Sequence, residues 1–188
     1  SPSMAARVGR MSSLATTKYH SRGRSPLPDG KVRIFLHHSS VPYSSGPAAS
    51  PAAPLALSPT ASPGAAITED EVRQAQVAWA NAIKSISKTY LDNGDYVAAA
   101  TKAAGELYGY GHSEVLFKPT KARSAQFRPT AADAMSYFVG HAAVKDGYTE
   151  DAGFAINGGK GWSDVVFSNH QVSLSGQVAF AMGNYYFT

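Results

Sequence analysis

Residues 163–187, SDVVFSNHQVSLSGQVAFAMGNYYF, decide the fold class because they contain two long runs rich in strand-forming residues. The runs 163–174 and 177–187 meet at Ser175-Gly176, which predicts an antiparallel hairpin. Successive side chains of a strand point to opposite faces of its sheet. Along 177–187 both alternating sets are largely apolar or aromatic, so we expect both faces of this strand to be largely covered.

Two helices are predicted ahead of this hairpin. Thr68 and Glu71 have the spacing of a capping box, and Asn93-Gly94 ends the run that follows. Larger side chains recur in that run at helical intervals, at Val72, Gln76, Trp79, Ile83, Ile86 and Tyr90. Asp95 can cap a second helix. The two helices are expected to form a helical hairpin.

A short strand over 114–118 and a third helix over 131–144, capped by Thr130 and Asp133, complete the pattern. The order is therefore helix, helix, strand, helix, strand, strand. It predicts an α+β fold in which a curled antiparallel sheet wraps around helices gathered on one face. Three strands are too few for that helix set, so we expect further strands after Thr188.

The part of the chain before residue 67 differs in composition. Residues 1–33 carry seven of the 17 Lys and Arg side chains but one of the 13 Asp and Glu side chains, so the formal net charge of +4 comes from this region. Residues 1–30 predict a disordered basic tail, with a composition that also resembles an organellar transit peptide. Residues 32–36 form a strand candidate within a segment 31–43, and the Pro/Ala/Ser-rich stretch 44–66 predicts a linker.

Composition excludes several function classes. The chain has no Cys, which excludes disulfides, thiolate metal ligands and a Cys nucleophile. Lys and Arg do not cluster in the region 67–188 as a nucleic-acid-binding domain requires. No apolar run approaches the roughly 20 residues that cross a bilayer. We therefore expect no nucleic-acid partner and no membrane partner.

Four sequence motifs closely resemble those of the iota-class carbonic anhydrases of algae and bacteria, and they follow one another in the order found in that family. They are VLFKPTKA at 115–122, QFR at 126–128, SYFVG at 136–140 and AMGNYYF at 181–187. The resemblance covers about 67–188. It implies a cone-shaped α+β fold similar to ketosteroid isomerase, a homodimer or an intramolecular pairing of repeats, and reversible hydration of CO2 to bicarbonate. With the Ser/Arg-rich tail, it also suggests a plastid or secretory-route compartment.

In that family the domain ends on a His-His-Ser-Ser-x-Pro-Tyr motif, which stands here at 37–43, before the domain. A slice through a tandem-repeat protein would give this order, with residues 31–43 ending one repeat and 67–188 forming most of the next. A circular permutation, in which 32–40 pairs back into the sheet, is the second hypothesis. Under both hypotheses we expect the penultimate strand to be absent.

Either histidines that bind a metal ion or hydroxyl side chains could carry the reaction. A carbonic anhydrase commonly activates water on Zn held by three His, but no zinc-type spacing is visible among the six histidines. The resemblance includes metal-free members, so no cofactor is expected, with Zn or Mn as the alternative. The positions that match the metal-free site are Thr120, Tyr137 and one of Ser39 and Ser40. A tyrosine could also take part in proton movement if its surroundings lower its pKa.

Three further residues are substrate-binding candidates. Arg128 could hold bicarbonate through bidentate bonds, although a structural ion pair is the commoner role of such a residue. Alternation along a strand puts His37 with Ser39 on one face and His38 with Ser40 on the other, so one pair faces the cavity. The sequence leaves open which pair this is. A non-catalytic association or ligand-binding module of the same fold is the rival function.

Overall fold

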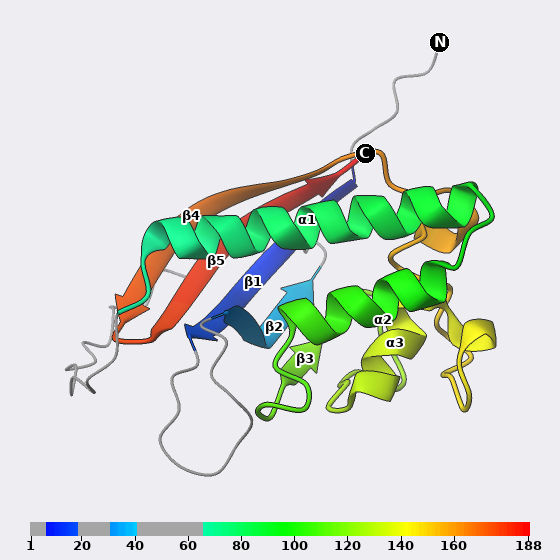
Figure 1. Ribbon diagram of the computed structural model, residues 1–188, viewed down its shortest axis with the longest axis horizontal. Coiled ribbons are helices and arrows are strands. Elements are labelled where there is room, and N and C mark those ends of the chain that lie inside the picture. Colours follow the sequence, from blue (N-terminus) through cyan, green and yellow to red (C-terminus); the bar gives the residue numbers. More distant parts are fainter. Residues whose placement is uncertain (1–6, 19–30, 41–65) are drawn as a thin grey trace, which may run out of the picture.

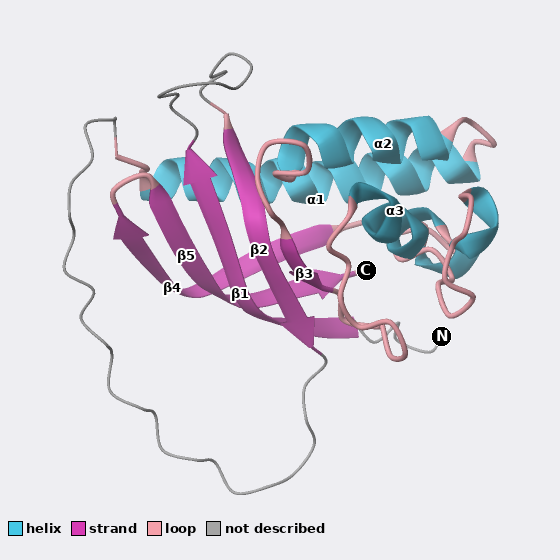
Figure 2. Ribbon diagram, turned by 90° about the horizontal axis from the view of Figure 1, so that it is seen from below, coloured by secondary structure: helices cyan, strands magenta, loops and turns pink. Residues whose placement is uncertain are grey.

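A computed structural model describes residues 7–18, 31–40 and 66–188 of the chain. In the described part, five strands form one sheet: β1 (Arg7–Lys18), β2 (Val32–Ser40), β3 (Leu116–Lys118), β4 (Val165–Ser175) and β5 (Val178–Phe187). Their order in the sheet is β3-β2-β1-β5-β4 (Figures 1 and 2). β2 and β3 run parallel, and the other neighbouring pairs are antiparallel. With the helices below, the fold is mixed α and β, as predicted.

The prediction that the penultimate strand is absent was wrong. β1 lies between β2 and β5 and pairs with both of them, so a segment assigned to a disordered tail completes the sheet. This strand was hard to predict because Ser, Thr and Arg dominate Arg7–Lys18 and its apolar residues do not alternate over a long run.

The segment 32–40 belongs to the same sheet as the hairpin 165–187, because β2 pairs with β1 on one side and β3 on the other. This is the pairing that the circular-permutation hypothesis requires. The origin of the chain in a tandem-repeat protein stays a prediction. The rest of the predicted tail, 1–6 and 19–30, and residues 41–65 of the predicted segment and linker lie outside the described residues.

The three helices are α1 (Glu69–Leu91), α2 (Tyr96–Leu107) and α3 (Ala131–Val139). The capping boxes at Thr68 and Thr130 are both present, and the Asp95 side chain accepts from Ala98 N. α3 ends earlier than the predicted residue 144 because Gly140 takes a φ of 96°, which a right-handed helix does not accommodate. No helix in the described part of the chain is long and apolar enough to cross a membrane.

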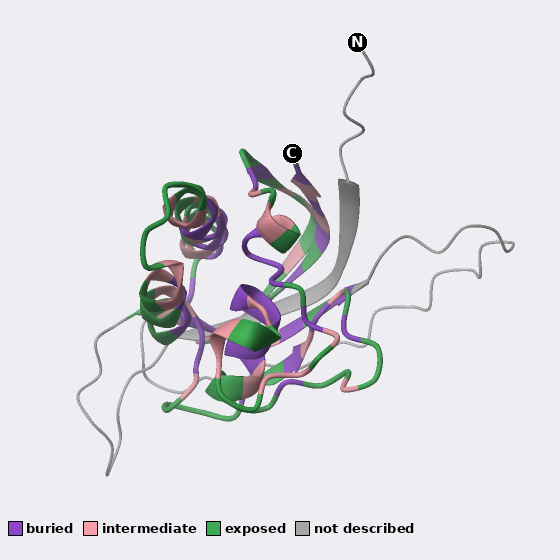
Figure 3. Ribbon diagram, turned by 90° about the vertical axis from the view of Figure 1, so that its right-hand side faces the viewer, coloured by how far each residue is buried: buried purple, intermediate pink, exposed green. Residues whose placement is uncertain are grey.

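The helices cover one face of the sheet, and the buried segments of the two layers face each other (Figure 3). Many of the buried side chains between the layers are aromatic. α1 packs against β4, β5 and β2, and α2 lies beside it (Figure 1). Trp79 of α1, 3% exposed, is the centre of this core. Ring centroids within about 6 Å of its own belong to His37, Phe154, Phe167, Tyr185 and Phe187.

A bulge between Asn169 and Gln171 of β4 is fixed to α1 by an amide pair. Gln76 Nε2 donates to Asn169 Oδ1 at 2.8 Å, and Asn169 Nδ2 donates to Gln76 Oε1 at 2.9 Å. Gly183 of β5 lies opposite this bulge, where a Cβ would collide with the carbonyl oxygen of Ser168 and lie 2.8 Å from Asn169 Cα. The close approach of the two backbones therefore requires glycine at 183.

The first prediction concerns the sheet position of β2. Because β2 is hydrogen-bonded on both sides, amides of 32–40 should resist hydrogen exchange about as strongly as those of α1. Exchange followed by NMR or mass spectrometry on the full chain measures this. Exchange of 32–40 at the rate of an unstructured peptide, with α1 protected, would show that β2 is not part of the sheet.

The second prediction concerns Gly183. Gly183→Ala should lower the free energy of unfolding by about 1–3 kcal/mol, since backbone atoms of β4 must move to admit the methyl group. Gly105→Ala in α2 is the matched control, because nothing lies within 4 Å of its added Cβ. That change should stabilise the helix by roughly 0.5–1 kcal/mol. Urea unfolding of both variants measures these changes. Equal changes in the free energy of unfolding would contradict the close approach of the two backbones at Gly183.

Candidate functional site

Three hydroxyl groups from distant parts of the chain meet at the inner face of the sheet. The Thr120 hydroxyl donates to Ser39 Oγ at 2.6 Å and lies 3.0 Å from the Tyr185 hydroxyl oxygen. Ser39 and Tyr185 are 2% and 3% exposed, whereas Thr120 is partly exposed. We call Ser39, Thr120 and Tyr185 the hydroxyl cluster. Each group can donate one hydrogen bond and accept others, so the cluster can hold a small polar molecule.

The sheet places these three residues. The parallel ladder of β2 and β3 pairs His38 with Lys118, and Ser39 and Thr120 lie just beyond its end. Tyr185 comes from β5, where alternation puts it on the buried face with Ala181 and Phe187. The cluster is therefore assembled from two strands, β2 and β5, and from the loop that follows β3.

The structure shows which half of the His-His-Ser-Ser motif faces inward. His37 and Ser39 are buried, 5% and 2% exposed, while His38 is exposed to solvent. The alternation expected from the sequence therefore holds, and it brings His37 and Ser39 to the site side. His38 lies away from the hydroxyl cluster. The side chain of Ser40 lies outside the described residues.

Tyr137 of α3 is next to the loop that carries Thr120. The backbone N–H of Lys121 donates to the Tyr137 hydroxyl at 3.4 Å, and the phenol ring stacks on Phe154 with centroids 5.3 Å apart. Because the amide of Lys121 occupies one lone pair of this oxygen, the phenol proton can be donated to a bound molecule. Tyr137 also borders an open cleft of about 890 Å³, with Lys121, Phe154 and Phe187 among its lining residues.

The tyrosines of the site stay protonated. Burial raises the pKa of Tyr137, with the nearby Tyr185 adding to the effect, and burial likewise raises the pKa of Tyr185. The condition for a role of Tyr137 in proton abstraction, a lowered pKa, is therefore not met. Both phenols are neutral hydrogen-bond donors near neutral pH.

His37 lies deeper, among aromatic rings. Its Nδ1 is 2.9 Å from the Tyr108 hydroxyl, which also accepts from Trp79 Nε1 at 3.0 Å. Its ring stacks on Phe117 with centroids 5.2 Å apart. Among the described residues, the buried Nε2 of His37 has no hydrogen-bond partner. Leaving such an atom unpaired costs about 1–3 kcal/mol, so this position favours a bound polar molecule.

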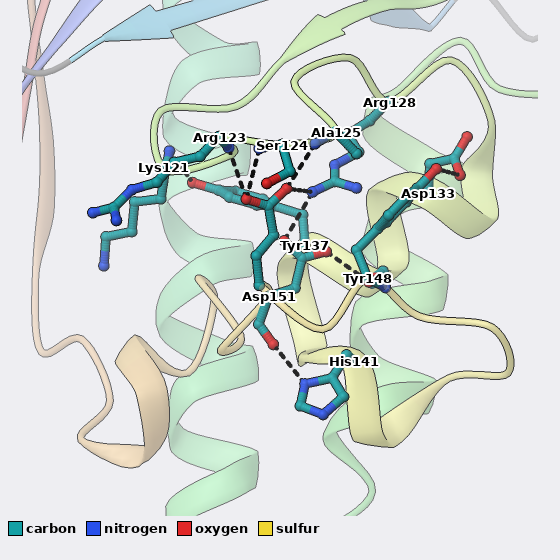
Figure 4. A network of polar contacts seen from close by, with 12 residues as sticks. Lys121, Arg123, Ser124, Ala125, Arg128, Asp133, Tyr137, His141, Tyr148 and Asp151 are labelled. Carbon is teal, nitrogen blue, oxygen red and sulfur yellow. Dashed lines mark hydrogen bonds and ion pairs between the residues drawn. The ribbon is translucent and has the colours of Figure 1, made fainter.

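Arg128 has a different environment from the one predicted. Its side chain is fully buried; Nη2 donates to Asp151 Oδ1 at 2.9 Å and lies 3.6 Å from Glu150 Oε1 (Figure 4). The guanidinium also stacks over the Tyr148 ring at 3.9 Å. The geometry is that of a structural ion pair, the commoner role of such a residue. The structure does not bring Arg128 to the hydroxyl cluster.

The described residues offer no group of three or more His, Asp or Glu side chains that could hold a metal ion. The paired histidines show why, since His37 is buried and His38 points to solvent.

Sequence reasoning missed Tyr185, Tyr108 and the acidic pair Glu150 and Asp151. Tyr185 carried a signal, because a tyrosine on a strand face shared with Ala and Phe is buried and needs a partner for its hydroxyl. Tyr108 ends α2 and Glu150 lies in a loop, where neither periodicity nor motif spacing marks a residue.

Comparisons with known proteins show which family the chain resembles. The family model described as metal-independent carbonic anhydrase matches residues 70–188. A metal-independent carbonic anhydrase of Nostoc sp. (strain PCC 7120) is 43% identical over 122 residues, which are 63% of this chain and 57% of that protein. The chain thus spans little more than half the length of this curated relative.

A solved structure gives the same result. It is the crystal structure of an iota-carbonic anhydrase from a cyanobacterium in complex with bicarbonate, 40% identical, with a TM-score of 0.59 over 65% of this chain and 73% of that one. The family model covers well over half of the chain and includes Thr120, Tyr137 and Tyr185. The chain belongs to the metal-independent carbonic anhydrase family.

Proposed function

We propose that this chain interconverts CO2 and bicarbonate at the hydroxyl cluster, without a metal ion. The observation that carries the proposal is the meeting of Ser39, Thr120 and Tyr185, with hydroxyl distances of 2.6 and 3.0 Å, at the edge of an aromatic core. CO2 is apolar and favours such a core, whereas water and bicarbonate need hydrogen-bonding partners. The cluster supplies both surroundings within one small volume.

The cluster can also move a proton. As the oxygen of a water molecule bonds to the carbon of CO2, the water passes one proton to a hydroxyl oxygen of the cluster. When that hydroxyl is Tyr185, it releases its own proton to Thr120, 3.0 Å away, and Thr120, the partly exposed member, turns its own hydroxyl proton from Ser39 to solvent and releases it there. The products are bicarbonate and one proton, and every hydroxyl ends neutral. Such a relay needs no phenolate, in agreement with the raised pKa values of Tyr137 and Tyr185.

Neutral donors around the cluster suit an anionic product. The Tyr137 proton can be donated to a bicarbonate oxygen, because the oxygen of this phenol already accepts from Lys121 N. His37 adds a second neutral group: burial, with the charge of His38, lowers its pKa to about 4. If the Tyr108 hydroxyl donates to His37 Nδ1, the proton of the ring lies on the unpaired Nε2. We propose that His37 contributes this N–H to the bound molecule.

The third prediction tests the hydroxyl cluster. Thr120→Val removes one hydroxyl at nearly constant volume and should lower kcat/KM for CO2 hydration about 100-fold, the effect of losing one positioned hydrogen-bond group. Stopped-flow hydration assays on chelator-treated protein measure this, and zinc addition should not change the rate. Tyr137→Phe should lower the rate about 10-fold or more.

The matched control is Thr101→Val, an exposed threonine of α2 whose hydroxyl donates to Val97 O. This variant should keep the activity of the unaltered protein. If Thr120→Val and Thr101→Val were equally active, the cluster would not be the site. Activity that appears only after metal is added would contradict the metal-free chemistry.

The fourth prediction concerns His37 and pH. Its pKa of about 4 in the folded chain lies below the ordinary value near 6.5, so the unfolded chain binds a proton first as the pH falls. The free energy of unfolding should therefore decrease from pH 6.5 towards pH 4, by about 3 kcal/mol from this residue. His37→Gln should remove most of this slope, whereas His170→Gln, at an exposed site, should keep it. Identical slopes would show that His37 is not buried as a neutral ring.

A further inference from the structure

A carboxylate outside the hydroxyl cluster holds the loop that carries Thr120. We call residues 119–128, between β3 and α3, the Thr120 loop. Three successive backbone N–H groups of this loop donate to the Glu150 side chain. Arg123 N and Ser124 N donate to Oε2 at 2.9 and 3.0 Å, and Ala125 N donates to Oε1 at 2.9 Å.

The neighbouring carboxylate holds both the end of this loop and α3. Asp151 Oδ1 accepts from Arg128 Nη2 at 2.9 Å, and Asp151 Oδ2 accepts from Ser136 Oγ at 2.6 Å. Arg128 is the last residue of the Thr120 loop, and Ser136 precedes Tyr137 in α3. Figure 4 shows Arg128 and Tyr148 converging near Asp151 beside α3.

Backbone contacts tie the same segment to Tyr137. Phe154 N donates to the carbonyl oxygen of Tyr137 at 2.8 Å, and the Phe154 ring stacks on the phenol. Residues 150–154 therefore contact both the Thr120 loop and the helix that carries Tyr137. The direct link between the two is the contact of Lys121 N with the Tyr137 hydroxyl, at 3.4 Å.

We infer that Glu150 is a positioning residue, whose carboxylate fixes the Thr120 loop so that Thr120 meets Ser39 and Tyr185 while Lys121 N reaches Tyr137. The inference rests on the proposed function, because it assigns Glu150 to the geometry of that site. Glu150 itself does not touch the hydroxyl cluster in the described contacts. It acts through the backbone of 123–125.

The chemistry of a carboxylate suits this role. Two ionised oxygens can accept three N–H donors, and such charge-assisted bonds are about twice as strong as neutral ones. An amide side chain has one acceptor oxygen, and its NH2 group would face a backbone N–H. The hydrogen bonds from Ser124 and Ala125 lower the pKa of Glu150, so it stays ionised near neutral pH. The charge of Arg128, 3.6 Å away, adds to this effect.

The fifth prediction is that Glu150→Gln lowers kcat/KM for CO2 hydration about 10-fold or more, well below the melting temperature. A displacement of about 1 Å at a reacting group can cost 100-fold in rate, so a partly released loop gives an effect of this size. Glu106→Gln is the matched control, since Glu106 is an exposed carboxylate of α2 away from the loop. It should leave the rate unchanged.

Amide NMR shifts of Arg123, Ser124 and Ala125 test whether Glu150 holds these backbone N–H groups, without any assay of activity. In the unaltered chain these shifts should follow the protonation of Glu150, with a midpoint below the ordinary glutamate pKa of 4.5. Asp151 lies next to Glu150 and has a pKa raised by burial, so its titration is followed at Ser136, and only a response that Glu150→Gln abolishes is assigned to Glu150. In Glu150→Gln the three amides should show no such titration.

The possible results separate the two proposals. If Glu150→Gln loses the amide contacts of 123–125 but hydrates CO2 at nearly the rate of the unaltered chain, the positioning role of Glu150 is overturned. If the amides titrate as expected but the chain has no hydration activity, the proposed function is overturned. The contacts of Glu150 with the backbone of 123–125 would still be confirmed. If Glu150→Gln does not fold, Glu150→Asp keeps the charge with a shorter side chain, and a rate equal to that of Glu106→Gln would contradict the inference.

Discussion

The parallel pairing of β2 with β3 is the interaction on which the site depends. It covers three residue pairs, Leu36 with Leu116, His37 with Phe117 and His38 with Lys118. This register brings Ser39 and Thr120 together just past the end of the ladder, where their hydroxyl oxygens are 2.6 Å apart. A shift by one residue would turn His38 inward and move Ser39 to the solvent face, because strand side chains alternate. The short ladder is held in turn by β1, which joins β2 to the β4–β5 hairpin.

Part of this fold follows from local sequence signals. The capping boxes at Thr68 and Thr130 and the hairpin turn at Ser175-Gly176 were predicted because their residues act on neighbours a few positions away. β1 was not predicted, since what makes it a strand is the pair of edges that β2 and β5 offer to its backbone. Pairing between distant segments leaves little trace in the composition of either one.

The candidate site, like the fold, was predicted only in part from the sequence. Thr120, Tyr137 and Ser39 could be named because they stand in motifs, and strand alternation reduced the His-His-Ser-Ser motif to two choices. Choosing between them required the burial of His37. Arg128 was assigned to the substrate because a guanidinium binds carboxylates and bicarbonate equally well. Only the three-dimensional arrangement shows that Asp151 and Glu150 lie against its Nη2 atom.

The ion pairs of Arg128 lie apart from the hydroxyl cluster, and this separation distinguishes the site. Arg128, a buried cation, lies in an ion-pair network with carboxylates that hold the loop and α3, whereas the three members of the hydroxyl cluster are uncharged. A buried cation beside the cluster would hold bicarbonate strongly and slow its release, whereas neutral donors stabilise the anion less and exchange readily with water. Rigidity then has to come from elsewhere, because single hydrogen bonds of about 1 kcal/mol do not fix a loop. The charged network supplies that rigidity from a distance, while the hydroxyl cluster itself consists of uncharged groups.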